Sequence, residues 1–154
     1  MKTICIAPAL FALGLATNAG ATIAVGSKAP DFSAQASLGG KEFSFSLSEA
    51  LQRGAVVLYF YPAAFTKGCT IEAHDFAEAT DRLKSLGATV IGVSHDTIDT
   101  LDKFSVSECR SKFAVVADPD QKIIKAYDVV LAKHPQYADR TSFVIGPNHK
   151  VLFS

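Results

Sequence analysis

Residues 56–76, VVLYFYPAAFTKGCTIEAHDF, join an apolar run to an amphipathic one across a short turn. The run from Val56 to Tyr61 is rich in β-branched and aromatic residues, which is typical of a buried strand. Pro62 ends this strand because proline cannot donate a hydrogen bond to a sheet ladder. From Cys69 onward apolar residues recur at spacings of four and three, which predicts a helix. The turn therefore delivers Cys69 into the first turn of that helix.

The position of Cys69 favours a reactive thiolate. The first N–H groups of a helix have no internal partner and the helix dipole is positive there, so a thiolate is stabilised. The Thr66 hydroxyl can bond the thiolate or an oxygen atom of a substrate, and Gly68 lets another group approach closely. The alternative is that Cys69 is a small buried apolar residue, as many free cysteines are.

The segment Pro62-Ala-Ala-Phe-Thr66-Lys-Gly-Cys69 resembles the Pro-x-x-x-Thr-x-x-Cys signature of the peroxiredoxins. The surrounding YFYP…GCTIEA is most similar to the bacterioferritin comigratory protein (peroxiredoxin Q) branch, and the similarity runs from about Gly26 to the last residue. This resemblance implies a thiol-dependent peroxidase that reduces hydrogen peroxide and alkyl hydroperoxides without metal or other cofactor. Cys69 would be the peroxidatic residue, Thr66 would help to activate it, and Pro62 would shape the pocket.

The resemblance also implies roles for two charged residues. Arg140, in DRTSFVIGP, matches the family's Arg-Ser/Thr-x-Phe phrase, whose arginine bonds the thiolate and the peroxide. Glu72 matches a glutamate that orients this arginine through a bidentate pair. From the residues alone, Arg140 could equally be a solvated surface charge. Glu72 could simply be an acid that favours the first turn of a helix.

Cys109 is the candidate for resolving the oxidised Cys69. Relatives in this branch often carry a second cysteine five residues after the first, but that position is His74 here. Other members resolve with a cysteine in the region of Cys109, so the resemblance implies a Cys69–Cys109 disulfide after turnover. The alternative is that Cys109 is a core residue and the enzyme is of the one-cysteine type. The pair Cys69-Thr-Ile-Glu72 is not Cys-x-x-Cys, which argues against a disulfide oxidoreductase.

Strand and helix patterns alternate along the chain and end in a hairpin, which predicts an α/β fold with a mixed central sheet and helices on both faces. This is the thioredoxin-like layout that the resemblance implies. The helix after Cys69 is expected to bury one face, and Asp96 is expected to cap the next helix. The inner face of the first is predicted to comprise Phe76, Ala79, Leu83 and Leu86. The family continues into a C-terminal helix, so we expect that the chain, which stops at Ser154 in the last strand, is truncated.

Residues 1–21 have the pattern of a secretory signal peptide: Lys2, then an apolar run, then Ala19-Gly20-Ala21. We predict cleavage after Ala21, with residues 22–154 forming the exported domain in the periplasm or outside the cell. Cys5 would leave with the signal, and the remaining cysteines would enter a compartment where a disulfide persists. The alternative is a buried N-terminal helix.

The composition of the 154 residues narrows the possible partners. Fifteen basic and fifteen acidic residues give a formal charge of zero, so nothing suggests nucleic-acid binding. The four histidines have no zinc-ligand spacing. We expect a monomer without stable membrane association after cleavage, which is reduced by a thioredoxin-like or other thiol protein. The rival hypothesis is a non-catalytic binding domain of the same fold, in which Cys69 would be unreactive.

Overall fold

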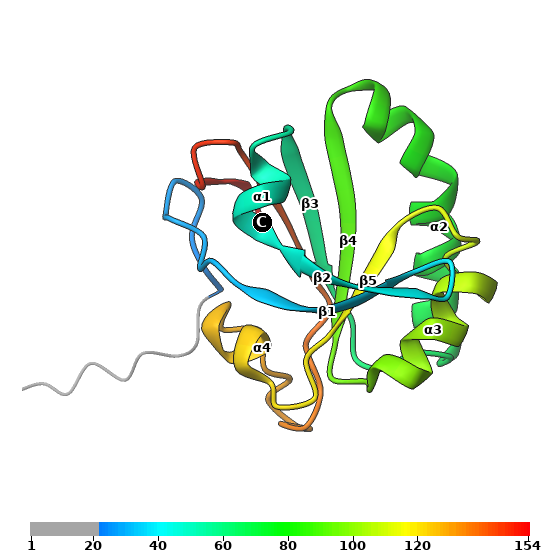
Figure 1. Cartoon of the computed structure of the whole chain (residues 1–154). Coiled ribbons are helices and arrows are strands. Elements are labelled where there is room, and N and C mark those ends of the chain that lie inside the picture. Colours follow the sequence, from blue (N-terminus) through cyan, green and yellow to red (C-terminus); the bar gives the residue numbers. More distant parts are fainter. Residues whose placement is uncertain (1–21) are drawn as a thin grey trace, which may run out of the picture.

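The computed structural model describes residues 22–154, and the predicted signal peptide lies outside the described residues. Seven strands form one sheet in the order β2-β1-β5-β4-β3-β6-β7 (Figure 1). The strands are β1 (Ser33–Leu38), β2 (Lys41–Ser46), β3 (Ala55–Phe60), β4 (Ala88–Ser94), β5 (Ala114–Ala117), β6 (Thr141–Ile145) and β7 (Val151–Phe153). The helices are α1 (Leu47–Leu51), α2 (Lys67–Ser85), α3 (Ile98–Ser107) and α4 (Lys122–Ala126).

The sheet is mixed, as predicted. Its centre is the parallel set β3, β4 and β5, whose crossovers are α2 and α3. Antiparallel strands extend both sides: β1 joins β5 and carries β2, while β6 joins β3 and carries β7. Parallel strands need long crossover connections, and here these connections supply the helix that carries Cys69.

Helices cover both faces of the sheet, which confirms the predicted α/β class. Helices α2 and α3 lie together on one face, and α1 and α4 lie on the other (Figure 1). Alternate residues of β3 divide between two cores, because successive side chains of a strand point to opposite faces. Tyr59 and Tyr61 belong to the core that includes Cys69, whereas Leu58 and Phe60 belong to the opposite core.

The buried face of α2 differs from the prediction. Ala79 is exposed and Leu86 is 73% exposed, although both were expected to face the core. The buried residues are instead Cys69, Ala73, Ala77 and Thr80. Their spacings of four, four and three continue the stripe that begins at Cys69, because the helix lies with that stripe against the sheet. Small residues on this stripe let the helix approach the sheet closely.

An aromatic layer lies between α2 and the sheet. The ring of Tyr59 stacks on Tyr61 and Phe76, with centroid distances of 5.3 Å and 4.3 Å. Gly92 of β4 lies under this ring: a Cβ there would stand 2.9 Å from the Tyr59 ring carbons. The bulk that small residues leave out of α2 is thus supplied by tyrosines of β3. Among residues 22–154, no helix is both long and apolar enough to cross a membrane.

Candidate active site

Cys69 lies in the first turn of α2, which begins two residues before it, with Thr66 as the N-cap. Thr66 makes no side-chain capping bond, and the first intrahelical bond runs from the Thr70 N–H to the Thr66 carbonyl at 2.9 Å. The N–H groups of Lys67, Gly68 and Cys69 therefore precede the hydrogen-bonded part of the helix. Donors without helical partners beside a thiol form an environment that favours an anion.

Arg140 reaches Cys69 from the other side of the sequence. The residue lies just before β6, which pairs with β3 and so ends beside the turn that leads into α2. Its Nη2 donates to the Cys69 Sγ at 3.3 Å, across 71 residues of chain. The predicted meeting of this arginine with the cysteine is therefore present in the structure, because the β3–β6 pairing brings both to one end of the sheet.

Glu72 contacts the same guanidinium one helical turn after Cys69. Its Oε2 accepts a hydrogen bond from Arg140 Nη1, and this single contact replaces the bidentate pair that was expected. Burial raises the pKa of the Glu72 carboxyl, and the neighbouring Arg140 opposes the rise. Burial lowers the pKa of Arg140, but its contacts with Cys69 and Glu72 outweigh that effect and the pKa is raised. The guanidinium thus stays charged between the two acceptors.

Gly68 explains how the guanidinium comes so near the helix. A Cβ at this position would stand 3.2 Å from Arg140 Nη2, which is tighter than an ordinary contact. The hydrogen at this position leaves room for the arginine to lie against the first turn of α2. The close approach that the sequence suggested at Gly68 is therefore made by Arg140.

Thr66 and Pro62 shape the turn rather than touch the sulfur. The Thr66 hydroxyl donates to the Ala63 carbonyl at 3.0 Å, so its oxygen lone pairs remain available as acceptors. The Pro62 carbonyl lies 3.0 Å from His95 Nδ1. Between them Phe65 has a positive φ of 63°, and its ring meets the edge of Phe104 on α3 at 5.3 Å.

Asp96 is a site residue that sequence reasoning misplaced. It was expected to cap α3, but the N-cap of α3 is Thr97. The Asp96 Oδ2 instead accepts from the Ala64 N–H and from the Ser94 hydroxyl, both at 2.8 Å. Asp96 therefore holds the turn before Cys69 from the end of β4. Its place directly after a buried strand adjacent to β3 was the only signal that could have suggested this contact.

Cys109 lies beyond the end of α3, in the same buried core as Cys69. Both thiols are free, and their exposed fractions are 0% and 1%. Burial raises the pKa of the Cys109 thiol, and the charge of Glu108 adds to the rise. Cys109 is therefore a neutral thiol in this arrangement, while Cys69 has a cationic partner.

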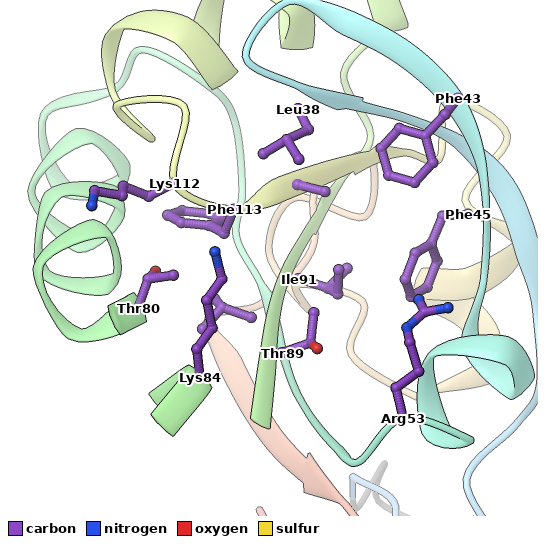
Figure 2. Close-up of a pocket in the computed structure, with 12 residues that line it drawn as sticks. Leu38, Phe43, Phe45, Arg53, Thr80, Lys84, Thr89, Ile91, Lys112 and Phe113 are labelled. Atoms are coloured by element: carbon purple, nitrogen blue, oxygen red, sulfur yellow. The ribbon is translucent and has the colours of Figure 1, made fainter. Parts of the chain in front are cut away.

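No metal-binding cluster is found in the described part of the chain: no three His, Cys, Asp or Glu side chains come together there. A hollow of about 200 Å³ opens elsewhere, at the beginning of β4 (Figure 2). Phe43, Phe45 and Ile91 line its apolar part, and Lys84 and Arg53 lie at it as well. Cys69, Thr66 and Arg140 are not among its lining residues, so this hollow is separate from the cysteine site.

Comparison with known proteins places these features in a family. Residues 25–154 match the model of the AhpC/TSA family. A bcp peroxiredoxin of Helicobacter pylori is 39% identical over 103 residues, which are 67% of this chain and 64% of that protein. The match thus spans less than two thirds of that relative's length. Peroxiredoxin Bcp of Bacillus subtilis is 36% identical over 136 residues, covering 85% of this chain and 83% of the relative.

Solved structures agree with the sequence comparison. The crystal structure of a PrxQ mutant of Xylella fastidiosa matches with a TM-score of 0.77 and 28% identity, covering 87% of this chain and 86% of that one. The expected thioredoxin-like fold is confirmed by this likeness. With the family model covering nearly every described residue, the chain belongs to the AhpC/TSA family, among the peroxiredoxins of the Bcp and PrxQ branch.

Proposed function

We propose that this protein is a thiol-dependent peroxidase that reduces hydrogen peroxide and alkyl hydroperoxides at Cys69. The single observation that carries the proposal is the 3.3 Å contact between Arg140 Nη2 and Cys69 Sγ at the start of α2. A thiol that meets a fixed cation and free N–H donors in one place favours its thiolate, which is the nucleophilic form. Family membership supports the same reaction, since the relatives that match are named as peroxiredoxins.

The first chemical step is attack of the Cys69 thiolate on the terminal peroxide oxygen. An S–O bond forms while the O–O bond breaks, and the departing oxygen takes a proton and leaves as water or an alcohol. Cys69 is oxidised by two electrons to a sulfenic acid, and the peroxide is reduced by the same two. The Arg140 guanidinium and the N–H groups of Gly68 and Cys69 are the donors that face the charge developing on the oxygens. Thr66 serves as an acceptor that orients the peroxide O–H.

The second step returns Cys69 to its reduced state. The Cys109 sulfur attacks the Cys69 sulfur, a disulfide forms, and the sulfenic oxygen leaves as water with the Cys109 proton. A thioredoxin-like or other thiol protein then supplies two electrons and two protons to reopen the disulfide. In the one-cysteine alternative, an external thiol attacks the sulfenic acid directly and Cys109 remains a core residue.

The place of action is a further part of the proposal. The signal-peptide pattern of residues 1–21 supports export to the periplasm or beyond, with cleavage after Ala21. The exported domain would act as a monomer on peroxides that arrive from outside the cell. Intact mass of the protein recovered from the periplasm tests this, because an uncleaved chain would contradict export.

The reaction is tested by the rate of Cys69 oxidation. Reduced protein is mixed with hydrogen peroxide and quenched with N-ethylmaleimide at set times, and peptide mapping then follows each cysteine separately. We expect rapid loss of the Cys69 thiol in the wild type, none in Cys69→Ser, and a Cys69–Cys109 disulfide that is absent in Cys109→Ser. Oxidation of Cys69 at the rate of an ordinary thiol would reject the peroxidase and favour a binding domain.

A further inference from the structure

Three ion pairs join α2 to the segment that carries Cys109. The members on α2 are four and three residues apart, so they form one stripe along the helix. Their partners alternate along residues 108–112, which therefore run beside α2. We call this set the ion-pair ladder: His74–Glu108 at 3.0 Å, Glu78–Arg110 at 3.3 Å and Asp81–Lys112 at 2.9 Å.

The segment held by the ladder is strained as well as tied. Arg110 and Ser111 have φ values of 51° and 56°, a left-handed conformation that costs energy for residues other than glycine. The segment is also closed by backbone bonds from the Cys109 N–H to Phe104 and from the Lys112 N–H to Cys109. A strained segment persists only when its surroundings hold it, and the ladder supplies contacts on its outer side.

Resolution of Cys69 requires this arrangement to open. Both thiols are buried and unbonded, and a disulfide needs Cα atoms about 4.4–6.8 Å apart with suitably aimed side chains. Cys69 is also fixed on a helical turn that contacts Arg140. Local opening of α2 or of residues 108–112 must therefore precede the disulfide, and its rate depends on the contacts that are lost in the opening.

We propose that His74, Glu78 and Asp81 are positioning residues that set how fast Cys109 reaches oxidised Cys69, by holding residues 108–112 against α2. The inference rests on the proposed function, since it concerns the step after Cys69 oxidation. The ladder keeps Cys109 buried while Cys69 reacts with peroxide, and its release then limits the formation of the disulfide. Slower release leaves the sulfenic acid longer in reach of a second peroxide, which would oxidise it to the sulfinic acid.

The expected effects are modest for one pair and larger for three. The His74–Glu108 pair is the most shielded, with exposed side-chain fractions of 36% and 19%, whereas the other two pairs are largely exposed. Neutralising one pair should speed disulfide formation roughly 1.5-fold to 5-fold, which is the range that exposed ion pairs support. Raised ionic strength should speed the wild type in the same direction, because salt screens exposed charges.

The test separates resolution from oxidation in the full chain carrying Cys5→Ser. The chain has no tryptophan, so rapid quenching and mass spectrometry, rather than tryptophan fluorescence, follow the reaction. The variants are His74→Gln, Glu78→Gln, Asp81→Asn and the three combined. Asp120→Asn is the matched control, because it removes an exposed pair with Lys122 far from Cys109. One equivalent of hydrogen peroxide starts the reaction, and both the sulfenic acid and the disulfide are counted over time.

We expect the triple variant to form the disulfide faster and to accumulate less sulfinic acid, with its Cys69 oxidation rate and the Asp120→Asn control unchanged. Reversing one pair, with Glu78→Arg and Arg110→Glu together, should restore the wild-type rate. Unchanged or slower disulfide formation in the triple variant would overturn the ladder while leaving the peroxidase intact. Rapid sulfenic acid formation with no disulfide in the wild type would reject both Cys109 as resolving residue and the ladder. Absence of rapid Cys69 oxidation would reject the proposed function itself.

Discussion

At the scale of single residues, the site depends on one guanidinium and on the space left for it. Arg140 contacts the Cys69 sulfur and the Glu72 carboxylate, and it lies against the helix where Gly68 has no side chain. A guanidinium presents a rigid fork of donors, so one arginine can hold two acceptors in a fixed geometry. The position of that fork, rather than the cysteine alone, distinguishes this thiol from an ordinary buried one.

Gly68→Ala should slow Cys69 oxidation without destabilising the protein. The added methyl would stand 3.2 Å from Arg140 Nη2 and push the guanidinium away from the sulfur. Alanine is favoured over glycine in helices by about 1 kcal/mol, so the free energy of unfolding should stay level or rise. A drop in oxidation rate of roughly tenfold or more is expected, since losing a preorganised donor typically costs about 100-fold or more.

The control for this prediction is a double-mutant cycle with Arg140→Met. If the methyl acts through the guanidinium, adding Gly68→Ala to Arg140→Met should change the oxidation rate no further. Equal slowing by Gly68→Ala in both backgrounds would show that the glycine matters for another reason.

Glu72→Gln should show an effect that depends on pH. Burial raises the pKa of Glu72, so the folded protein takes up this proton more readily than the unfolded chain does. Stability from this group is therefore present below its unfolded pKa and is lost as pH rises through the folded pKa. The same protonation weakens the contact with Arg140, so its consequences for stability and for reactivity have opposite signs.

At neutral pH Glu72→Gln should oxidise roughly threefold to tenfold more slowly than the wild type, because a hydrogen bond to a charged group is weakened. As the pH falls below the raised pKa of Glu72, the wild type becomes neutral at this position too, and the two rates should converge. The measurement is the ratio of the two oxidation rates across pH. A ratio that stays constant would mean that Glu72 acts only through packing.

At the scale of elements, the turn between β3 and α2 is held by the end of β4. The Asp96 carboxylate binds the Ala64 N–H, and His95 Nδ1 lies 3.0 Å from the Pro62 carbonyl. Parallel strands end at the same edge of a sheet, so the residues after β4 naturally lie beside those after β3. The catalytic turn is thus fixed by its neighbour as well as by its own proline.

Asp96→Ala should lower the free energy of unfolding by about 1–3 kcal/mol, because it removes the charged acceptor of two hydrogen bonds. The Cys69 oxidation rate should fall as well, since the turn that positions the first N–H groups of α2 loses its support. Urea unfolding and peroxide kinetics measure the two effects. Asp99→Ala, on the exposed side of α3, is the matched control and should leave both nearly unchanged. A normal rate in Asp96→Ala would show that the turn holds itself.

At the scale of the whole molecule, the sheet separates two cores with different work. One core lies under α2 and α3 and contains both cysteines, and the other lies under α1 and α4. Tyr127 in the second core donates a hydrogen bond from its hydroxyl to the Pro30 carbonyl at 2.8 Å, across 97 residues. The second core therefore closes the entry segment onto the sheet without touching the site.

Tyr127→Phe should cost about 0.5–1.5 kcal/mol of stability, the usual net contribution of one hydrogen bond, and leave Cys69 oxidation unchanged. Tyr59→Phe is the matched comparison, because the buried Tyr59 hydroxyl has no hydrogen-bond partner among the described residues. Its removal should leave stability unchanged or raise it. Denaturant unfolding of the two variants provides the test, and equal losses would contradict the assignment of the Tyr127 bond.

The sequence by itself determined the local part of this protein. Strands, helices and the turn holding Pro62, Thr66 and Cys69 followed from the spacing of apolar residues and from proline, since those preferences act between near neighbours in the chain. The expected inner face of α2 was wrong at Ala79 and Leu86, because helical spacing admits several stripes and only the packing against the sheet selects one.

Only the tertiary structure decided which distant residues complete the site. Arg140 was expected at Cys69 through family resemblance, and the pairing of β3 with β6 is what brings it there. Asp96 and the ladder partners of α2 carried no usable signal, because such contacts depend on which strand ends and helix sides become neighbours. Local periodicity reports which side of an element is apolar. The partner that covers or contacts that side is set by the order of strands in the folded sheet.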